Sequence, residues 1–336
     1  PHQLQLLFFL ISSKWYIMSI LSINIKKRHM VNNKIRVGVI GLGYLGKFHF
    51  EKYRSNKSVN LTSIVDIDKK NLDLVNSKEV FRSTTFKDII GKVDAVSIVT
   101  PTITHFSIAK FFLENKVHVL LEKPMTESVS EAKELNVIAK KSRCIFQIGH
   151  LEQFNPAIRK LKSQLKAPEF IEVHRLCKFN PRAIDVDVVL DLMIHDIDIV
   201  LSLIDKNIKK ISVSGKKVIT NLIDIANVRI EFEDNVVANL TASRISTKNE
   251  RKMRIFLKNA YYSVDFINNE LKRLVKNKNN SFKTTRFGFK KSDSLNEEIK
   301  NFIKACYGKE KPMTSGESGL KALIVAKKIT RGFSRK

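Results

Sequence analysis

A glycine-rich turn between an apolar strand and a helix places the strongest constraint on how this chain folds. Residues 41–46 read Gly-Leu-Gly-Tyr-Leu-Gly and directly follow the short apolar run Ile35–Ile40. The first glycine permits a tight turn, the second lets the backbone approach a pyrophosphate, and the third allows close packing of helix on strand. The first N–H groups of the helix then face the phosphates. The pattern predicts a dinucleotide site, whose members in this turn are Gly41, Gly43, Tyr44, Leu45 and Gly46.

An acidic residue follows the next predicted strand at the expected distance. Asp66 ends the strand Leu61–Val65 and lies 20 residues beyond Gly46. A carboxylate at this place hydrogen-bonds the adenosine ribose of a bound dinucleotide. We therefore expect Asp66 and the adjacent Ile67 to bind the cofactor. The carboxylate favours NAD, but Lys69 and Lys70 leave NADP open.

The order of the remaining segments predicts two kinds of sheet. From residue 34 to 148, short apolar strands alternate with helices, which is typical of a parallel sheet covered on both faces. Several segments between residues 209 and 275 instead alternate with period two, as antiparallel strands with one buried face do. The 336 residues suffice for two domains. We predict an α/β protein with a Rossmann domain at residues 30–150 and an α+β domain at residues 151–336 that contains an open, mainly antiparallel sheet.

Two segments, residues 1–29 and 276–291, differ from the patterns of the two predicted domains. Leu4–Ile25 is mostly apolar and long enough to span a bilayer. It lacks the preceding charge and the cleavage site of a signal peptide. Because a strand begins almost directly after Met30, we interpret residues 1–29 as a non-native or disordered extension, and we expect no stable membrane association. Near the other end, residues 276–291 are predicted to form an exposed loop or sheet edge.

Charge and cysteine content bound the classes of partner. Lysine and arginine number 60 against 33 acidic residues, a net charge of +27. No nucleic-acid-binding motif accompanies this excess, so we expect no nucleic-acid partner; a composition bias and an electropositive site for an anionic substrate both remain open. Three separated cysteines without a CxxC pair argue against a disulfide framework or a cysteine zinc site, and they fit a cytoplasmic protein.

Two short motifs follow strand ends in the predicted parallel sheet. Thr100-Pro101-Thr102 follows one strand, and Glu122-Lys123 follows the next. Ligands of open α/β sheets bind outside the carboxyl ends of the strands, so both turns are expected to line the cofactor crevice. His105 lies three residues beyond Thr102, where either a cofactor contact or a packing role is possible.

A predicted long helix, Val188–Ile204, carries acids and a histidine within an apolar segment. Asp191 and His195 are spaced i, i+4 and therefore share one helix face, with Asp198 close to the same face. Burying such groups is costly, so they are either catalytic or satisfied structural groups. A metal site lacks a convincing third ligand, and none is predicted.

Together these segments resemble the Gfo/Idh/MocA oxidoreductase family. The resemblance rests on VGVIGLGYLGKFH at 37–49, VDID at 65–68, TPTITH at 100–105, EKPMT at 122–126, DLMIHDID at 191–198 and SGESGLKALIVAKKI at 315–329. It implies an NAD(P)-dependent enzyme that oxidises or reduces a sugar or cyclitol carbon. It also implies a homodimer or homotetramer formed through the second sheet, and a final helix, at about 315–330, that packs back on the first domain.

The resemblance also implies residue roles. The family's lysine falls on Lys123, which would hydrogen-bond the reacting hydroxyl and stabilise negative charge on its oxygen. Its histidine falls on His195, suited to take the hydroxyl proton near neutral pH. Its aspartate falls on Asp191, which would orient the imidazole or hold a neighbouring hydroxyl.

Two further segments narrow the resemblance within the family. Residues 149–156 and 185–191 look most like members that oxidise C3 of UDP-N-acetylglucosamine, a step that supplies amino sugars for lipid A. This implies a UDP-sugar substrate. The substrate-binding residues so implied are Lys123, His150, Asn155, Asp191 and His195. Gln153 departs from the pattern, which often has arginine there.

Two alternatives remain. In the first alternative, the chain is a dehydrogenase of a free sugar or inositol. In the second, it is a sensor that binds a sugar nucleotide and NAD without catalysis. The presence of Lys123, Asp191 and His195 together argues against the sensor, because a sensor needs no proton acceptor.

Overall fold

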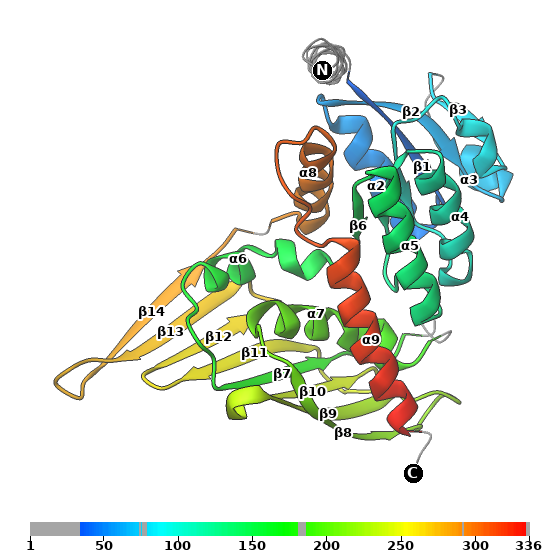
Figure 1. Cartoon of the computed structure of the whole chain (residues 1–336). Coiled ribbons are helices and arrows are strands. Elements are labelled where there is room, and N and C mark those ends of the chain that lie inside the picture. The colour runs from blue at the N-terminus through cyan, green and yellow to red at the C-terminus, as the bar shows by residue number, and fades with distance from the viewer. Residues whose placement is uncertain (1–33, 74, 76–78, 181–185, 291, 334–336) are drawn as a thin grey trace, which may run out of the picture.

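The computed structural model describes residues 34–73, 75, 79–180, 186–290 and 292–333, so the predicted extension at residues 1–29 lies outside the described part of the chain. The described residues form a six-stranded sheet and an eight-stranded sheet (Figure 1). This is the α/β architecture that the sequence predicts.

The first sheet is parallel and has the strand order β3-β2-β1-β4-β5-β6, the order of a doubly wound dinucleotide-binding fold. Its strands are β1 (Ile35–Ile40), β2 (Val59–Val65), β3 (Phe81–Ser83), β4 (Ala95–Ile98), β5 (His118–Leu121) and β6 (Phe146–Ile148). Its helices are α2 (Tyr44–Ser55), α3 (Lys69–Asp73), α4 (Thr102–Glu114) and α5 (Val129–Ser142).

Burial explains why these strands lack polar alternation. Every residue of β4 is buried, and so is all of β1 except Arg36. Helices on both faces leave no strand surface for water, so continuous apolar runs are stable. Local signals set the helix boundaries: Ser128 and Glu131 form a reciprocal capping box at the start of α5.

The second sheet has the order β14-β13-β12-β11-β7-β10-β9-β8. Neighbouring strands are antiparallel except for β7 and β10, which run parallel. The strands are β7 (Phe170–Leu176), β8 (Ile208–Lys216), β9 (Ile225–Phe232), β10 (Val237–Ser243), β11 (Glu250–Leu257), β12 (Ala260–Asp265), β13 (Glu270–Lys276) and β14 (Phe282–Gly288). The segment predicted as an exposed loop or edge contains β14, which is the edge strand.

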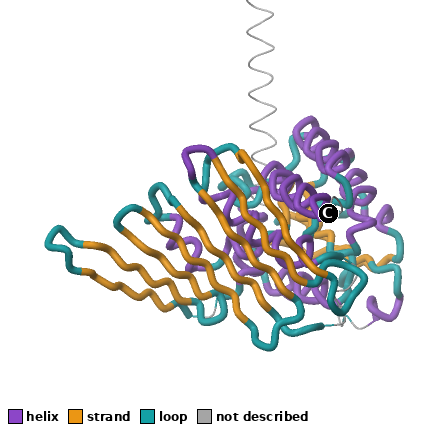
Figure 2. Tube along the Cα trace, turned by 90° about the horizontal axis from the view of Figure 1, so that it is seen from below, coloured by secondary structure: helices purple, strands orange, loops and turns teal. Residues whose placement is uncertain are grey.

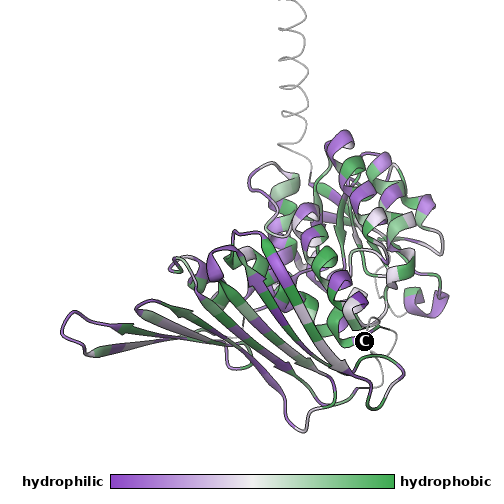
Figure 3. Ribbon diagram, turned by 60° about the horizontal axis from the view of Figure 1, so that its bottom comes forward, coloured by the Kyte–Doolittle hydropathy of each residue, from purple (hydrophilic) through white to green (hydrophobic). Residues whose placement is uncertain are grey.

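Among the described residues, helices cover one face of this sheet and not the other (Figure 2). Buried and partly exposed residues alternate along β7 and β10, and polar and apolar residues are mixed along the strands (Figure 3). The helices α6 (Pro156–Lys162), α7 (Ile194–Leu203) and α9 (Gly316–Phe333) lie on the inner face. Figure 2 looks directly onto the other face, and no helix lies in front of it.

The helix predicted at Val188–Ile204 is not a single α-helix. Residues Val189–Met193 form a π-helical turn, in which the N–H of Ile194 bonds the carbonyl of Val189, and α7 follows. Asp191 therefore lies on a wider turn than His195, so the predicted i, i+4 face is distorted. Turns of this kind occur frequently at functional sites.

The last two helices contact both halves of the molecule. The buried residues Ile299, Phe302 and Ile303 of α8 (Ser294–Cys306) belong to the core around β1 and β2. The final helix, α9, contacts α5 and β6 of the first half and α7 and β8 of the second. The sequence led us to expect only the final helix to return to the first domain, whereas α8 does so as well.

No helix in the described part of the chain is both long and apolar enough to cross a bilayer.

Candidate functional site

The predicted motifs meet at one edge of the parallel sheet. Gly41, Thr100, Glu122 and His150 lie within two residues of the ends of β1, β4, β5 and β6, respectively. Parallel strands bring their carboxyl ends to a common edge, where open α/β sheets bind ligands. The eight-stranded sheet adds α7 and the π-turn to this edge, because Lys123 reaches across to Asp191.

The glycine turn is shaped for close approach at three positions. Gly41 has a φ of +88° and its N–H bonds the carbonyl of Val65. A methyl group on Gly46 would lie 1.9 Å from the carbonyl oxygen of Gly41, so helix and strand can pack only around a glycine. A methyl group on Gly43 would meet no atom within 4 Å. The space above Gly43 is therefore open, as binding a pyrophosphate at the start of α2 requires.

Asp66 lies beside this turn. Its carboxylate accepts hydrogen bonds from the backbone N–H groups of Leu42 (2.6 Å) and Asp68 (2.8 Å). It also lines a cavity of about 500 Å³ next to the turn. The cavity is lined by Ile40, Gly41, Gly43, Val65, Asp66, Ile67, Asn71, Thr84, Thr85, Phe86, Val99, Thr100, Pro101, Thr104, Ser107 and Ile108. Its mixture of apolar walls and one carboxylate suits the adenosine half of NAD.

Several large apolar side chains near the glycine turn are exposed. They are Tyr44, Leu45, Ile67 and Ile103. Ile67, for example, is 91% exposed although it directly follows the buried Asp66. Apolar side chains around an open turn fit a ligand that covers them. The residues present therefore fit NAD.

His105 does not contact the open space that a cofactor would use. The side chain is buried, with Nδ1 2.9 Å from the carbonyl of Pro124 and Nε2 2.8 Å from the carbonyl of Thr100. Both ring nitrogens are thus occupied by backbone, and burial lowers the pKa of the imidazole. Of the two roles left open for His105, these contacts support the packing role: the ring links the turn after β4 to the turn after β5. A direct contact with the cofactor stays a prediction.

Glu122 is likewise a positioning residue. Its carboxylate lies 3.2 Å from Nε2 of His49 and accepts the N–H of Lys123 at 3.1 Å. A methyl group on Gly149 would come within 2.9 Å of this carboxylate. Burial alone would raise the pKa of Glu122, but the hydrogen bond from His49 and nearby positive charge hold that pKa below its usual value. The carboxylate therefore fixes the backbone from which the Lys123 side chain extends.

Lys123 and Asp191 come together from different halves of the chain. Nζ of Lys123 donates to the carbonyl oxygen of Asp191 at 3.0 Å and lies 3.5 Å from its Oδ1. Both side chains are about one-fifth exposed, so the ion pair remains accessible to a substrate. The sequence predicts these two residues for one site, and the structure brings them into contact.

His195 lies in the same cluster. Its ring and that of His150 meet edge to face with centroids 6.2 Å apart. Burial, and then the positive charges of Lys123 and Arg175, lower the pKa of His195 well below its usual 6.5. Nδ1 of each histidine is buried and has no hydrogen-bond partner among the described residues. The imidazole of His195 is therefore a neutral base whose proton-accepting capacity is not fully used.

The other two acids of the helix serve structure. Asp196 forms a two-point ion pair with Arg175 of β7 (2.7 and 2.8 Å), and Arg175 also bonds Glu152. Asp198 accepts a hydrogen bond from the buried amide of Gln153. The position that departs from the family pattern thus belongs to an internal contact between residues of the second half.

Asn155 has a structural role in the described residues. Its side chain is buried and accepts the N–H of Ala157, so it caps the start of α6. The cap uses the side-chain oxygen and leaves the amide NH2 group as a donor, so the role of Asn155 in substrate binding stays a prediction. Asparagine is among the residues preferred at that position.

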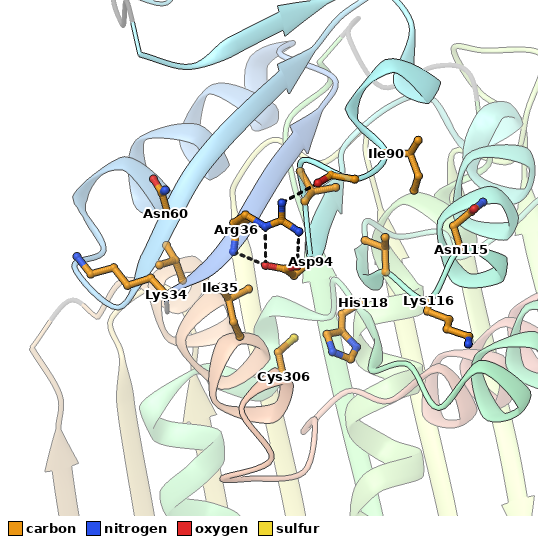
Figure 4. A pocket seen from close by; sticks show the side chains of 14 residues that line it. Lys34, Ile35, Arg36, Asn60, Ile90, Asp94, Asn115, Lys116, His118 and Cys306 are labelled. Atoms are coloured by element: carbon orange, nitrogen blue, oxygen red, sulfur yellow. Dashed lines mark hydrogen bonds and ion pairs between the residues drawn. The ribbon is translucent and has the colours of Figure 1, made fainter. Parts of the chain in front are cut away.

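A second cavity, of about 1100 Å³, lies at the opposite edge of the parallel sheet (Figure 4). It is lined by the amino ends of β1 and β5, by Cys306 and by Arg36, which is paired with Asp94 at 2.8 Å. None of the predicted site residues lines it. In the described part of the chain, no group of three or more His, Cys, Asp or Glu side chains is arranged to hold a metal ion.

Some members of the site give little sequence signal. Thr84, Thr85 and Phe86 line the cofactor cavity because β3 lies beside β2, a pairing that no local pattern reveals. Glu298 is fully buried under Glu122, and both of its carboxylate oxygens lack a partner among the described residues. Burial, together with the negative charges of Glu122 and Asp198, raises the pKa of Glu298 well above its usual value.

Comparison with family models gives two matches. A model described as an oxidoreductase family with an NAD-binding Rossmann fold matches residues 35–150. A model of the GFO/IDH/MocA C-terminal domain matches residues 172–263.

Individual proteins extend this similarity over most of the chain. UDP-N-acetylglucosamine 3-dehydrogenase of Acidithiobacillus ferrooxidans is 34% identical over 302 residues, which cover 88% of this chain and 96% of that protein. Its crystal structure superimposes with a TM-score of 0.84 over 89% of this chain and 97% of that one. A scyllo-inositol dehydrogenase of Lactobacillus casei with bound NAD(H) and scyllo-inositol shares the fold, with a TM-score of 0.74 at 18% identity, over 90% of this chain and 98% of that one.

Proposed function

Because the chain belongs to the Gfo/Idh/MocA oxidoreductase family, with its NAD-binding Rossmann fold, we propose that it oxidises C3 of UDP-N-acetylglucosamine to a ketone. The observation that carries the reaction type is the meeting of Lys123, Asp191 and a neutral His195 at the carboxyl edge of the NAD-binding sheet. The proposal for the sugar rests on the 34% identity to a 3-dehydrogenase of this substrate over nearly the whole chain.

Lys123 stabilises charge on the reacting oxygen. Its ammonium group donates hydrogen bonds and already lies between Asp191 and the strand end beside the cofactor turn. The hydroxyl oxygen develops negative charge as its proton leaves, and the carbonyl forms when the adjacent carbon gives up its hydride. A fixed donor aimed at that oxygen lowers the barrier.

His195 accepts the hydroxyl proton. The low pKa keeps the imidazole neutral at physiological pH, so no competing proton has to leave first. Its unpartnered ring nitrogen is buried, which excludes bulk water from one side of the ring. Asp191 orients the substrate and the Lys123 ammonium, through its carboxylate and its backbone carbonyl.

The glycine turn and the cavity beside Asp66 would hold NAD. When bound, it supplies the nicotinamide that accepts a hydride from the substrate carbon. Glu122 fixes the backbone at Lys123, and His105 holds the turn after β4 against the turn after β5.

A second candidate is the oxidation of an inositol. The shared fold with the inositol dehydrogenase favours it, but the similarity at 18% identity concerns the fold. A cyclitol lacks the nucleotide, so the two candidates differ in whether UDP competes with the substrate.

We propose that the uncovered face of the large sheet forms the contact of a homodimer or homotetramer. Phe170, Phe256 and Tyr261 form a row of aromatic rings there, with centroids 5.0 and 5.5 Å apart along the row. Their positions alternate with the buried residues of the inner face.

We also propose a reducing, cytoplasmic location, because the three cysteines are all free.

The test of the reaction is NADH formation from NAD and UDP-N-acetylglucosamine, with a partner aminotransferase and glutamate to remove the ketone. Lys123→Met is expected to lower kcat by about 100-fold or more, because a donor to the developing oxyanion is lost. NAD affinity, measured by calorimetry, is expected to stay near that of the unmodified chain.

Lys133→Met serves as the control, since Lys133 is an exposed lysine of α5 and is not a member of the cluster. Full activity in Lys123→Met would contradict the assigned mechanism. Inactivity of the unmodified chain on this sugar, with turnover of an inositol, would favour the second candidate.

A further inference from the structure

The side chain of one arginine on a central strand of the large sheet has no partner among the described residues. Arg251 is exposed near the start of β11, and within the described residues it forms neither an ion pair nor a side-chain hydrogen bond. Only its backbone carbonyl is used, by the N–H of Phe266. Neighbouring cations differ: Arg175 is bound by Asp196 and Glu152, and Arg254 is paired with Glu172.

The register of the sheet fixes the side on which Arg251 lies. It is directly opposite Arg175 in the antiparallel pairing of β11 with β7. Directly opposed residues point to the same face. Arg175 points inward to α7, so Arg251 belongs to the inner face with the site, whereas Lys252, opposite His174, belongs to the outer face.

The charge of Arg251 acts on residues of the Lys123–Asp191–His195 cluster, in agreement with its place on the inner face. Its positive charge is one of those that lower the pKa of His195. It also counteracts Asp191 in setting the pKa of Cys177, a thiol just beyond the end of β7. Arg251 thus belongs to the sheet face on which α7 and His195 lie, while Lys123 approaches from the NAD-binding half.

We infer that Arg251 is the anion-binding residue of the substrate site and holds a phosphate of a nucleoside diphosphate sugar. A guanidinium group presents two parallel donors that match a phosphate, and an unpaired one loses no protein contact on binding it. The inference rests on the proposed function, and it identifies the part of the substrate that an inositol lacks. Arg251 acts in recognition and does not touch the reacting carbon.

The test compares Arg251→Gln with Lys252→Gln. Both remove one positive charge from adjacent positions of β11, but only the first changes the inner face. Arg251→Gln is expected to raise KM for UDP-N-acetylglucosamine about 10- to 100-fold, the range for a charged hydrogen bond, with kcat within about threefold. Lys252→Gln is expected to leave both unchanged, and Arg251→Lys to restore part of the loss.

Competition identifies the group that is bound. UDP is expected to inhibit the unmodified enzyme more strongly than uridine does, and this preference is expected to disappear in Arg251→Gln. Unchanged NAD binding and an unchanged melting temperature show that the variant is folded. An equal KM for the two glutamine variants, or an unchanged preference for UDP, would overturn the inference.

The inference and the proposed function can fail separately. Turnover of UDP-N-acetylglucosamine with an unaltered KM in Arg251→Gln removes the role of Arg251 alone. No turnover of this sugar, but calorimetric binding of UDP that is lost in Arg251→Gln, removes the proposed sugar and retains the phosphate site. An unmodified enzyme that binds no UDP contradicts both.

Discussion

At the scale of single residues, the protonation state of His195 decides which pH range supports catalysis. A base must be neutral to accept a proton, and an imidazole in water is half protonated at about pH 6.5. Burial and the surrounding cations remove that limit by disfavouring the charged ring. In the proposed mechanism Lys123 therefore acts twice, as donor to the substrate oxygen and as one of the charges that keep His195 neutral.

The pH dependence of the reaction follows from this. Because the folded pKa of His195 lies well below 6.5, its protonation removes the base only at pH values below that point. We expect kcat/KM, measured across about pH 5 to 9, to show no loss attributable to His195 between pH 8 and 6.5, with the acidic decline below 6.5. An acidic limb centred at or above pH 6.5 would show that the imidazole titrates as an exposed group.

At the scale of elements, the junction of β1, the glycine turn and α2 separates binding from stability. Gly43 has extended backbone angles and open space around it, whereas Gly46 touches the carbonyl of Gly41. The same added methyl group is therefore expected to affect NAD binding at Gly43 and folding stability at Gly46.

Gly43→Ala is expected to keep the melting temperature of the unmodified chain but to weaken NAD binding at least about tenfold, or about 1.4 kcal/mol, because the methyl group enters the pyrophosphate space. Gly46→Ala is expected to lose about 1–3 kcal/mol of folding stability as well, since helix and strand must separate. Thermal unfolding and calorimetric titration with NAD measure the two effects. Equal destabilisation by both variants would contradict the assignment of Gly43 to binding.

The same junction shows what the sequence can predict. Strand, turn and helix are encoded within consecutive residues, so Gly41, Gly43, Gly46 and Asp66 could be placed on the correct edge of the correct sheet. A polar side chain that chooses among distant partners leaves no such record. Gln153, for example, donates a hydrogen bond to Asp198, 45 residues further along the chain, and no local pattern reveals that pair.

The π-turn before α7 also depends on a residue that is distant in sequence. Periodicity predicts one regular helix, but an extra residue in one turn costs little when tertiary contacts hold it. Here Lys123, 68 residues away in sequence, bonds the carbonyl of Asp191 within that turn. The residues of the catalytic cluster could be named from the sequence, whereas their relative orientation required the packing of two sheets.

At the scale of the whole molecule, α8 joins the two halves through an unusual buried group. The carboxyl group of Glu298 has no partner in the described part of the chain and lies near Glu122 and Asp198, one from each half. Its backbone carbonyl accepts a hydrogen bond from Gln147 of β6. Its pKa, raised well above 4.5, keeps it protonated in the folded chain.

A raised acid pKa makes stability depend on pH in one direction. Below about 4.5 the unfolded chain is also protonated at this residue, so its contribution is fully present there. It is lost as pH rises toward the folded pKa, because only the unfolded chain then releases the proton. We expect Glu298→Gln, which keeps the neutral form, to show a smaller fall in melting temperature between about pH 5 and 8 than the unmodified chain. An identical fall in both would show that the carboxyl group ionises freely in the fold.

The contribution of α8 to the first core also bears on synthesis. A ribosome releases all six strands of the NAD-binding sheet long before it releases Ile299, Phe302 and Ile303, which complete one apolar cluster of that sheet. Until α8 is synthesised, part of the apolar surface of the N-terminal half therefore stays uncovered. We expect the uncovered apolar surface to favour chaperone binding and aggregation during that interval, although domains usually fold as they emerge. The first half of the chain matures only after the segment that follows the second sheet has left the exit tunnel.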